Sequence, residues 1–216
     1  MNLFESLLAL TFVAAALLKL SNRFGIPYEL RIQRDLGAVR PQSQPQTDRI
    51  HEGDWNDALE PVPGLLIHVL PARHYSGRML TGNKTLWVAF ALETSQRRLF
   101  FSGDSGYGPH FREIGERFGG FDLVALDMGQ YDKRWANIHM FSEQAAQDLR
   151  AKALLPAQVG RFTIAAHGWD EPLNQIDRAS QGRPYRLPTP NIGALVLLDD
   201  ETQQFPRWWK RAVSKA

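Results

Sequence analysis

Five short apolar runs, each bounded by glycine, proline, asparagine or aspartate, most constrain the fold of this chain. They are LLIHVL (65–70), TLWVAFAL (85–92), RRLFFSG (97–103), FDLVALDMG (121–129) and GALVLLDD (193–200). Runs of this length, rich in Val, Phe and Leu, are typical of β-strands. A further strand-like run, in LLPAQV, ends near Gln158.

Two stretches between these runs have the features of helices. Residues 109–119 carry apolar side chains at helical spacing and end in Gly119, a common stop residue. Residues 141–155 begin with Ser142 as a candidate N-cap and end before Pro156. Strands that occur both as neighbours and in alternation with helices predict a mixed α/β fold, with helices over one or more sheets.

Composition narrows the function classes. With 216 residues and 44% hydrophobic residues, the chain is long enough for one well-buried domain. The net charge is only +2, and basic residues mix with aromatic ones only in the tail RWWKRAVSKA, so we expect no nucleic-acid partner. That tail is interpreted as a surface helix end with stacking tryptophans. Cysteine is absent, so a transition metal would need histidine and carboxylate ligands.

The first 48 residues differ from the rest of the chain in composition and in hydrophobic pattern. Residues 7–18, LLALTFVAAALL, carry no charge but are well short of the ~20 residues that span a bilayer. A buried helix is the favoured interpretation, and a signal or anchor is the alternative. Residues 29–48 are polar and without a clear period, which is typical of a linker. We therefore divide the chain into a helix and linker over 1–48 and a domain over 49–216.

Polar residues that follow strand-like runs are the candidate site residues. His74, Asp104 and His167 each lie beyond such a run. An aspartate at a strand end is often only a turn former, because its side chain bonds its own backbone. It is equally a ligand or base at the carboxyl edge of a sheet. The residues alone leave both interpretations open.

Taken together, these motifs resemble a known family. The order of His74, FFSGDSGY, FDLVALDMGQYDKRW, IHMFSEQAAQDL, LLPAQVGRF and WDEP is similar to that of metallo-β-lactamase-fold hydrolases. The resemblance is to the branch of N-acyl-phosphatidylethanolamine phospholipase D, and within it to the RomA-type proteins of enterobacteria. It covers residues 49–216, and it extends less clearly to 18–28.

The resemblance implies a pair of zinc ions that activate water for attack on a phosphodiester or phospholipid. Asp104 matches the bridging carboxylate, and His74 matches a zinc ligand. The resemblance also implies a cytoplasmic protein, linked in the RomA-type group to outer-membrane composition and antibiotic susceptibility. An association with the cell envelope through residues 7–18 is the alternative location.

Two departures from the family pattern change this expectation. The stretch His-x-His-x-Asp-His, which supplies four ligands, is absent from the chain. The last family ligand falls on Gln158, and a neutral amide is a poor zinc ligand beside imidazole. We therefore expect weak zinc binding or none, and a non-catalytic family member. The alternative is an active hydrolase in which His51, His139 and His167 complete an unusual site.

A truncated family member is the simplest interpretation of these departures. The family fold is an αββα sandwich, and the chain would supply mainly its carboxyl-terminal half. A sheet that lacks its partner exposes an apolar face, so we expect self-association or membrane association.

Overall fold

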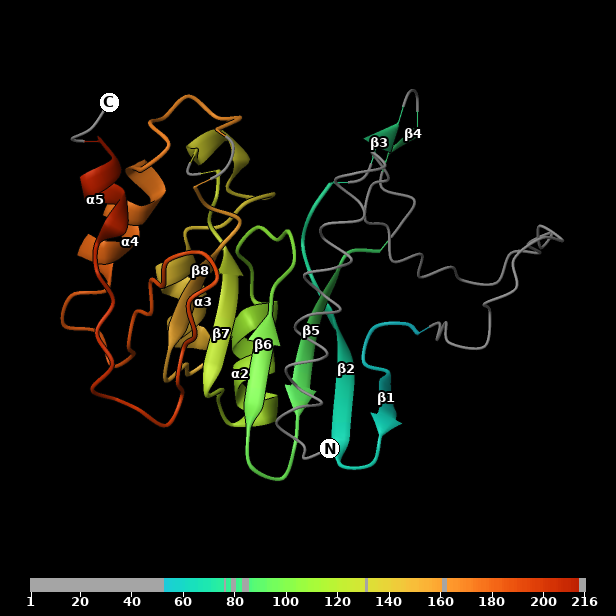
Figure 1. Cartoon of the computed structure of the whole chain (residues 1–216). Helices are drawn as coiled ribbons and strands as arrows, with labels where there is room; N and C mark the ends of the chain where they lie inside the picture. Colours follow the sequence, from blue (N-terminus) through green and yellow to red (C-terminus); the bar gives the residue numbers. More distant parts are fainter. Residues whose placement is uncertain are drawn as a thin grey trace, which may run out of the picture. The chain divides into compact units, whose positions relative to one another are not determined.

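The computed structural model describes residues 53–75, 77–78, 81–82, 86–130, 132–160 and 163–213 (Figure 1). The predicted helix and linker over 1–48, and the candidate ligand His51, lie outside these residues. Within the described part, no helix is both long and apolar enough to cross a membrane.

One six-stranded sheet organises the described residues, in the order β1-β2-β5-β6-β7-β8. Its strands are β1 (Ala58–Val62), β2 (Leu65–Pro71), β5 (Val88–Glu93), β6 (Arg98–Phe101), β7 (Leu123–Asp127) and β8 (Leu154–Ala157). The pairs from β1 to β6 are antiparallel, whereas β6, β7 and β8 run parallel. A short separate hairpin joins β3 (Gly77–Arg78) and β4 (Thr81–Gly82).

The register of the sheet separates a helix-covered face from a second face. On the covered face, one row crosses five strands, and all of its side chains are buried: His68, Ala91, Phe100, Val124 and Leu154. The neighbouring row on the other face is apolar but only partly buried: Ile67, Leu92, Leu99 and Leu123. Both faces are therefore apolar, as a sheet covered on both sides requires.

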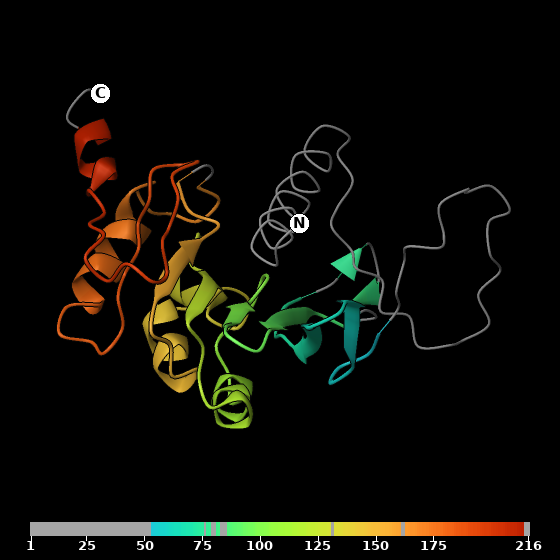
Figure 2. The same cartoon turned by 60° about the horizontal axis from the view of Figure 1, so that its bottom comes forward.

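The helices are α2 (His110–Phe118), α3 (Ser142–Asp148), α4 (Glu171–Ala179) and α5 (Trp208–Val213). Helices α2 and α3 lie on the same side of the sheet (Figure 2). In α2, Phe111, Ile114 and Phe118 are buried, and the helix ends at Gly119 in the left-handed conformation. The helix predicted over 109–119 is confirmed, because its apolar spacing matches the face that packs on the Phe100 row.

One predicted element was too long and another was wrong. The helix predicted over 141–155 is confirmed for Ser142–Asp148 only. Leu154–Ala157 forms β8, which confirms the strand-like run predicted to end near Gln158. Arg150 adopts a positive φ of 51°, which stops the helix and turns the chain back along the sheet. The run at 193–200 is not a strand but a series of turns. The bridge partner of Ala153, next to β8, is Arg186. In the described residues, the run at 193–200 therefore does not pair with β8.

The carboxyl-terminal tail follows the prediction. It forms α5, in which Trp208 stacks on Trp169 at 6.3 Å between ring centroids. Trp209 is fully buried and donates a hydrogen bond to Asn174 of α4. Helix α4 and strand β1 were not anticipated. Strand β1 has only one partly buried residue, so it lacks the apolar run that marks the other strands.

Candidate active site

Four strands of the sheet end at the same edge. Strand β5 runs antiparallel to both β2 and β6, and β7 and β8 run parallel to β6. The carboxyl ends of β2, β6, β7 and β8 therefore share one edge, which we call the strand-end edge. It is the position at which open α/β sheets bind their ligands.

A buried ion pair lies at the strand-end edge. Asp127 is the last residue of β7, and its side chain is completely buried. Its Oδ2 lies 2.6 Å from Nδ1 of His139. The backbone of Gly129 donates to Oδ1 at 3.3 Å, and the backbone of Asp127 donates to Ser102 Oγ at 2.9 Å. Asp127 is thereby fixed in position, and it orients the His139 ring.

The environment shifts the pKa of both members of the pair. Burial raises the pKa of Asp127, and this outweighs the opposing hydrogen bond and charge of His139. Burial by itself would lower the pKa of His139, but the hydrogen bond and charge of Asp127, together with the charge of Asp104, raise it. Relative to a free histidine, the imidazolium form of His139 is therefore stabilised. Because Asp127 holds Nδ1, Nε2 is the ring nitrogen that can donate to a ligand.

His74 packs against this pair. Its ring lies 5.2 Å from the His139 ring and 4.3 Å from that of Trp87, measured between centroids. Nδ1 lies 2.9 Å from the carbonyl oxygen of Tyr75, and Nε2 is buried without a hydrogen-bond partner among the described residues. An Nδ1–H that donates to a carbonyl leaves a lone pair on Nε2, which is the usual state of a histidine that ligates a metal.

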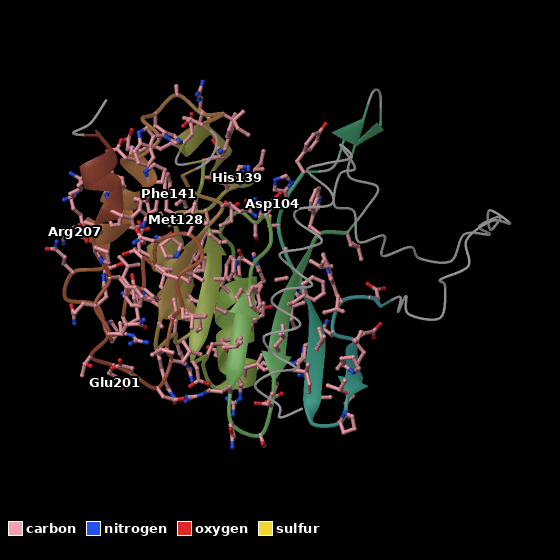
Figure 3. All side chains as sticks on the ribbon, in the orientation of Figure 1. Asp104, Met128, His139, Phe141, Glu201 and Arg207 are labelled. Carbon is pink, nitrogen blue, oxygen red and sulfur yellow. The ribbon has the colours of Figure 1, made fainter. Side chains whose placement is uncertain are left out.

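Asp104 lies close enough to this pair for its negative charge to raise the pKa of both Asp127 and His139. Figure 3 shows Asp104 and His139 at the same end of the sheet. The Asp104 loop packs directly on the segment before His139. A Cβ added to Gly106 would lie 2.2 Å from the carbonyl carbon of Asn137, so only glycine allows this approach. The interpretation of Asp104 as more than a turn former rests on this placement.

Gln158 lies at the same edge, immediately after β8. It has a φ of 59° and is exposed. A Cβ on Gly129 would lie 1.8 Å from the carbonyl oxygen of Gln158, so the segments that follow β7 and β8 touch here. Gln158 therefore occupies the edge on which the other candidate residues meet.

His167 lies near Asp132. Asp132 belongs to the segment between β7 and His139. The hydrogen bond from Arg134 holds the pKa of Asp132 at about 2, and the charge of His167 makes a smaller contribution in the same direction. The Nδ1 atom of His167 lies 2.8 Å from the carbonyl oxygen of Gly168.

The described residues do not complete a zinc site. His74 Nε2 has the chemistry of a ligand and Asp104 offers a carboxylate, but a catalytic zinc usually needs three protein ligands. Across the described ranges, no three His, Cys, Asp or Glu side chains are grouped so as to hold a metal ion. We therefore derive no chemical step through a metal.

The sequence reasoning missed Asp127. The signal was present, since FDLVALDMG ends in an Asp-x-Gly pattern, as does the run that leads into Asp104. The apolar composition of the run predicts a strand, and it does not indicate by itself that Asp127 at the end of the strand pairs with His139.

Comparison with known proteins decides the family. The model described as "Beta-lactamase superfamily domain" matches residues 17–158. The chain belongs to this superfamily. A solved metallo hydrolase from the hyperthermophilic archaeon Ignicoccus hospitalis has the same fold, with a TM-score of 0.51, 17% identity and coverage of 68% of this chain and 59% of that chain. The predicted metallo-β-lactamase fold is therefore confirmed.

Similar sequences occur in several organisms. Outer membrane protein RomA of Klebsiella pneumoniae is 55% identical over 100 residues, which are 45% of this chain and 76% of RomA. An uncharacterized protein of Mycobacterium tuberculosis is 36% identical over 178 residues, which are 80% of this chain but 47% of that protein. An N-acyl-phosphatidylethanolamine-hydrolyzing phospholipase D of Caenorhabditis elegans is 36% identical over 94 residues, 41% of this chain and 26% of that enzyme. The chain thus spans about half of the mycobacterial relative's length.

Proposed function

We propose that the strand-end edge binds the headgroup of a phospholipid-type ligand, and that the described residues act by binding rather than by metal-dependent hydrolysis. The Asp127–His139 pair carries this proposal. An imidazolium whose Nδ1 is held by a buried carboxylate offers Nε2 to a phosphodiester oxygen as a charge-assisted donor. The similarity to the nematode N-acyl-phosphatidylethanolamine-hydrolyzing phospholipase D supports the choice of ligand class.

The charges around His139 favour a zwitterionic headgroup. Asp104 adds a carboxylate beside the imidazolium, and its charge acts on both Asp127 and His139. A ligand that carries only negative charge would be repelled by this carboxylate. A headgroup with a phosphodiester and an ammonium group offers one partner to His139 and the other to Asp104.

An apolar cavity beside β8 supports a ligand with hydrocarbon chains. Its volume is about 200 Å³, and Val159 of its lining directly follows Gln158 at the strand-end edge. The other apolar lining residues come from β8, α4, α5 and the segment between α4 and α5, and include Leu173, Ile192 and Trp208. Sites for small molecules are commonly apolar with a few placed polar groups, and this edge has that combination.

Sedimentation of the full chain with phospholipid vesicles tests the proposal. We expect binding to phosphatidylcholine vesicles, weaker binding to phosphatidylglycerol vesicles, and an affinity about tenfold lower for His139→Asn. His167→Asn is the matched control, and we expect it to bind like the unchanged chain. Equal binding by His139→Asn and the unchanged chain would refute the role of the pair.

A metal-dependent hydrolase is the second candidate, and one observation favours it. The buried, unpartnered Nε2 of His74 is a ligand atom without a ligand among the described residues. Elemental analysis and phosphodiester hydrolysis with added zinc separate the two candidates. Tightly held zinc together with activity that His74→Ala abolishes would establish the hydrolase and overturn the binding proposal.

The location of this chain is also a proposal. RomA is named an outer membrane protein. We propose that the chain associates with a membrane surface through the phospholipid-binding edge. Cell fractionation of the unchanged chain and of His139→Asn tests this, and equal membrane fractions for both would contradict it.

A further inference from the structure

A second pocket lies at the opposite edge of the sheet from the strand-end edge. It has a volume of about 230 Å³ and is formed by the β5–β6 turn, the turn between α2 and β7, and the segment between α3 and β8. Figure 1 shows the β5–β6 turn at the lower end of the sheet, away from the ends of β7 and β8. We call it the turn pocket. It is therefore distinct from the site described above.

The turn pocket is lined mainly by polar and basic residues. Four of its side chains are cationic and one is a carboxylate: Arg97, Arg98, Arg150, Lys152 and Asp122. The hydroxyl groups of Thr94 and Ser95 complete the lining together with the backbone of Gly119 and Gly120. These groups are donors that suit an anion.

Most of the basic side chains are already paired. Asp122 accepts hydrogen bonds from Lys152 Nζ at 2.9 Å and from the backbone of Arg98 at 2.9 Å, and it forms an ion pair with Arg97 at 3.4 Å. Asp199, which is outside the lining, also pairs with Arg97. Glu93, also outside the lining, lies 3.1 Å from Arg98.

Arg150 is the exception. Three carboxylates face four cations, and no acidic side chain in the described ranges pairs with the Arg150 guanidinium. One positive charge at the pocket is thus unbalanced. A guanidinium presents two parallel N–H groups, which match the geometry of a phosphate in particular.

The backbone holds Arg150 at the pocket by an uncommon conformation. Arg150 has a φ of 51°, which few residues other than glycine, asparagine and aspartate adopt. The facing residue Gly120 has a φ of 115°, and a Cβ there would lie 2.9 Å from the carbonyl oxygen of Arg150. Two turns in left-handed conformations therefore meet in close contact. This contact fixes the backbone from which the Arg150 side chain extends at the turn pocket.

We propose that the turn pocket binds a phosphate group, with Arg150 as its principal ligand and Lys152 as a secondary one. The volume is below the range of pockets for drug-sized molecules, which suits a phosphate or a small phosphorylated molecule. Lys152 contributes less because its side chain is 78% exposed and shared with Asp122. The phosphate can belong to a free ion or to a lipid headgroup.

Titration of the full chain with inorganic phosphate by calorimetry, at constant ionic strength, tests the proposal. We expect saturable binding that is about tenfold weaker in Arg150→Gln, because a charge-assisted hydrogen bond is lost. Arg150→Gly removes the same guanidinium and fits the φ of 51° without strain, so we expect the same loss in a folded chain. Arg178→Gln, which removes a cation from α4 outside the pocket, is the matched control, and we expect unchanged binding.

A second arm distinguishes the two sources of phosphate. Vesicles that contain phosphatidate are compared with phosphatidylcholine vesicles, for the unchanged chain and for Arg150→Gly. Binding that depends on Arg150 in either arm supports the proposal and identifies the source. Absence of saturable phosphate binding together with Arg150-independent vesicle binding would overturn it, as would an equal loss in Arg178→Gln. The vesicle arm is run in the His139→Asn background, where the strand-end edge no longer contributes, so the two proposed sites are tested separately.

Discussion

Nδ1 of His139 lies 2.6 Å from Oδ2 of Asp127, whose side chain is excluded from solvent at the end of β7. The two residues are twelve positions apart in the chain, and the 3-10 helix Lys133–Trp135 lies between them. This pair joins the last residue of a core strand to a loop that also contacts His74. It is the contact on which the candidate site depends.

We expect Asp127→Asn to lower the pKa of His139. The charge and hydrogen bond of Asp127 oppose the effect of burial on His139, so their loss leaves burial to favour the neutral ring. A ¹H–¹⁵N titration of the histidine rings measures the shift. Asp132→Asn, on the same segment, is the control and should leave His139 unchanged. A His139 pKa that does not fall in Asp127→Asn would mean that the pair does not set the charge of the ring.

We expect His110 to make stability depend on pH. Burial, with a smaller contribution from the charge of Arg73, lowers the pKa of His110 to about 4. The unfolded chain therefore binds a proton more readily than the folded chain between about pH 4 and pH 6.5, so stability falls as the pH falls through this window. Allowing for partial exposure, the loss is about 1–2 kcal/mol.

Urea unfolding of the full chain at pH 7 and pH 5 measures this effect. His110→Gln removes the titrating group, and the difference between the two pH values should shrink by the same amount. His167→Gln is the control and should retain the full difference. A pH dependence that is identical in His110→Gln and the unchanged chain would contradict the assignment.

The sequence predicted the central part of the fold because its signals were local. The spacing of Phe111, Ile114 and Phe118, with Gly119 behind them, marks α2 without reference to any other element. The strand run that precedes Asp104 was likewise found from its own composition. For elements of this kind, propensity and tertiary packing agree.

Elements that depend on distant partners could not be predicted in this way. The sequence supported two interpretations of residues 151–157, as the end of the helix predicted over 141–155 and as a strand-like run that ends near Gln158. Pairing with β7 decides for the strand, and Arg150 in a left-handed conformation separates it from α3. The run at 193–200 has the composition of a strand, yet Leu195 is 69% exposed because no strand pairs with it. The composition of a short apolar run does not indicate which strand it pairs with.

The candidate site was predicted in part for the same reason. His74, Asp104 and Gln158 follow strand-like runs, and the sheet topology brings those strand ends to one edge. The role of His139 depends on Asp127, and no spacing in the sequence indicates that two residues on either side of a 3-10 helix form a buried ion pair. The comparisons established the family, whereas the ligand set of a metal stays a prediction.

We expect Gln158→His to raise the affinity for zinc. The residue lies at the strand-end edge, and imidazole is a far better zinc ligand than a neutral amide. The unchanged chain should bind zinc no better than micromolar, because only His74 and Asp104 match family ligands. A competition titration with a chromophoric chelator measures both values. Gln96→His, in the β5–β6 turn at the opposite edge of the sheet, controls for a histidine added elsewhere, and an equal increase in both variants would contradict the site.

The second face of the sheet leads to the last prediction. Ile67, Leu92, Leu99 and Leu123 form an apolar row that is only partly buried, and the row opposite it on the helix face is fully buried. Apolar area yields about 25 cal/mol per Å² when it is removed from water, so a contiguous row of this kind favours association. We expect the full chain to self-associate at micromolar concentration.

Sedimentation velocity over a range of concentrations measures the association. Leu99→Gln places a polar side chain in the centre of the row and should shift the chain toward the monomer. Leu195→Gln, at an exposed position in the turns between α4 and α5, removes an equivalent leucine outside the row and should leave the distribution unchanged. Equal effects of the two variants would show that exposed leucines in general drive association. A monomer at all concentrations, with cooperative unfolding near the ~5–15 kcal/mol of an ordinary domain, would show instead that the row is already covered.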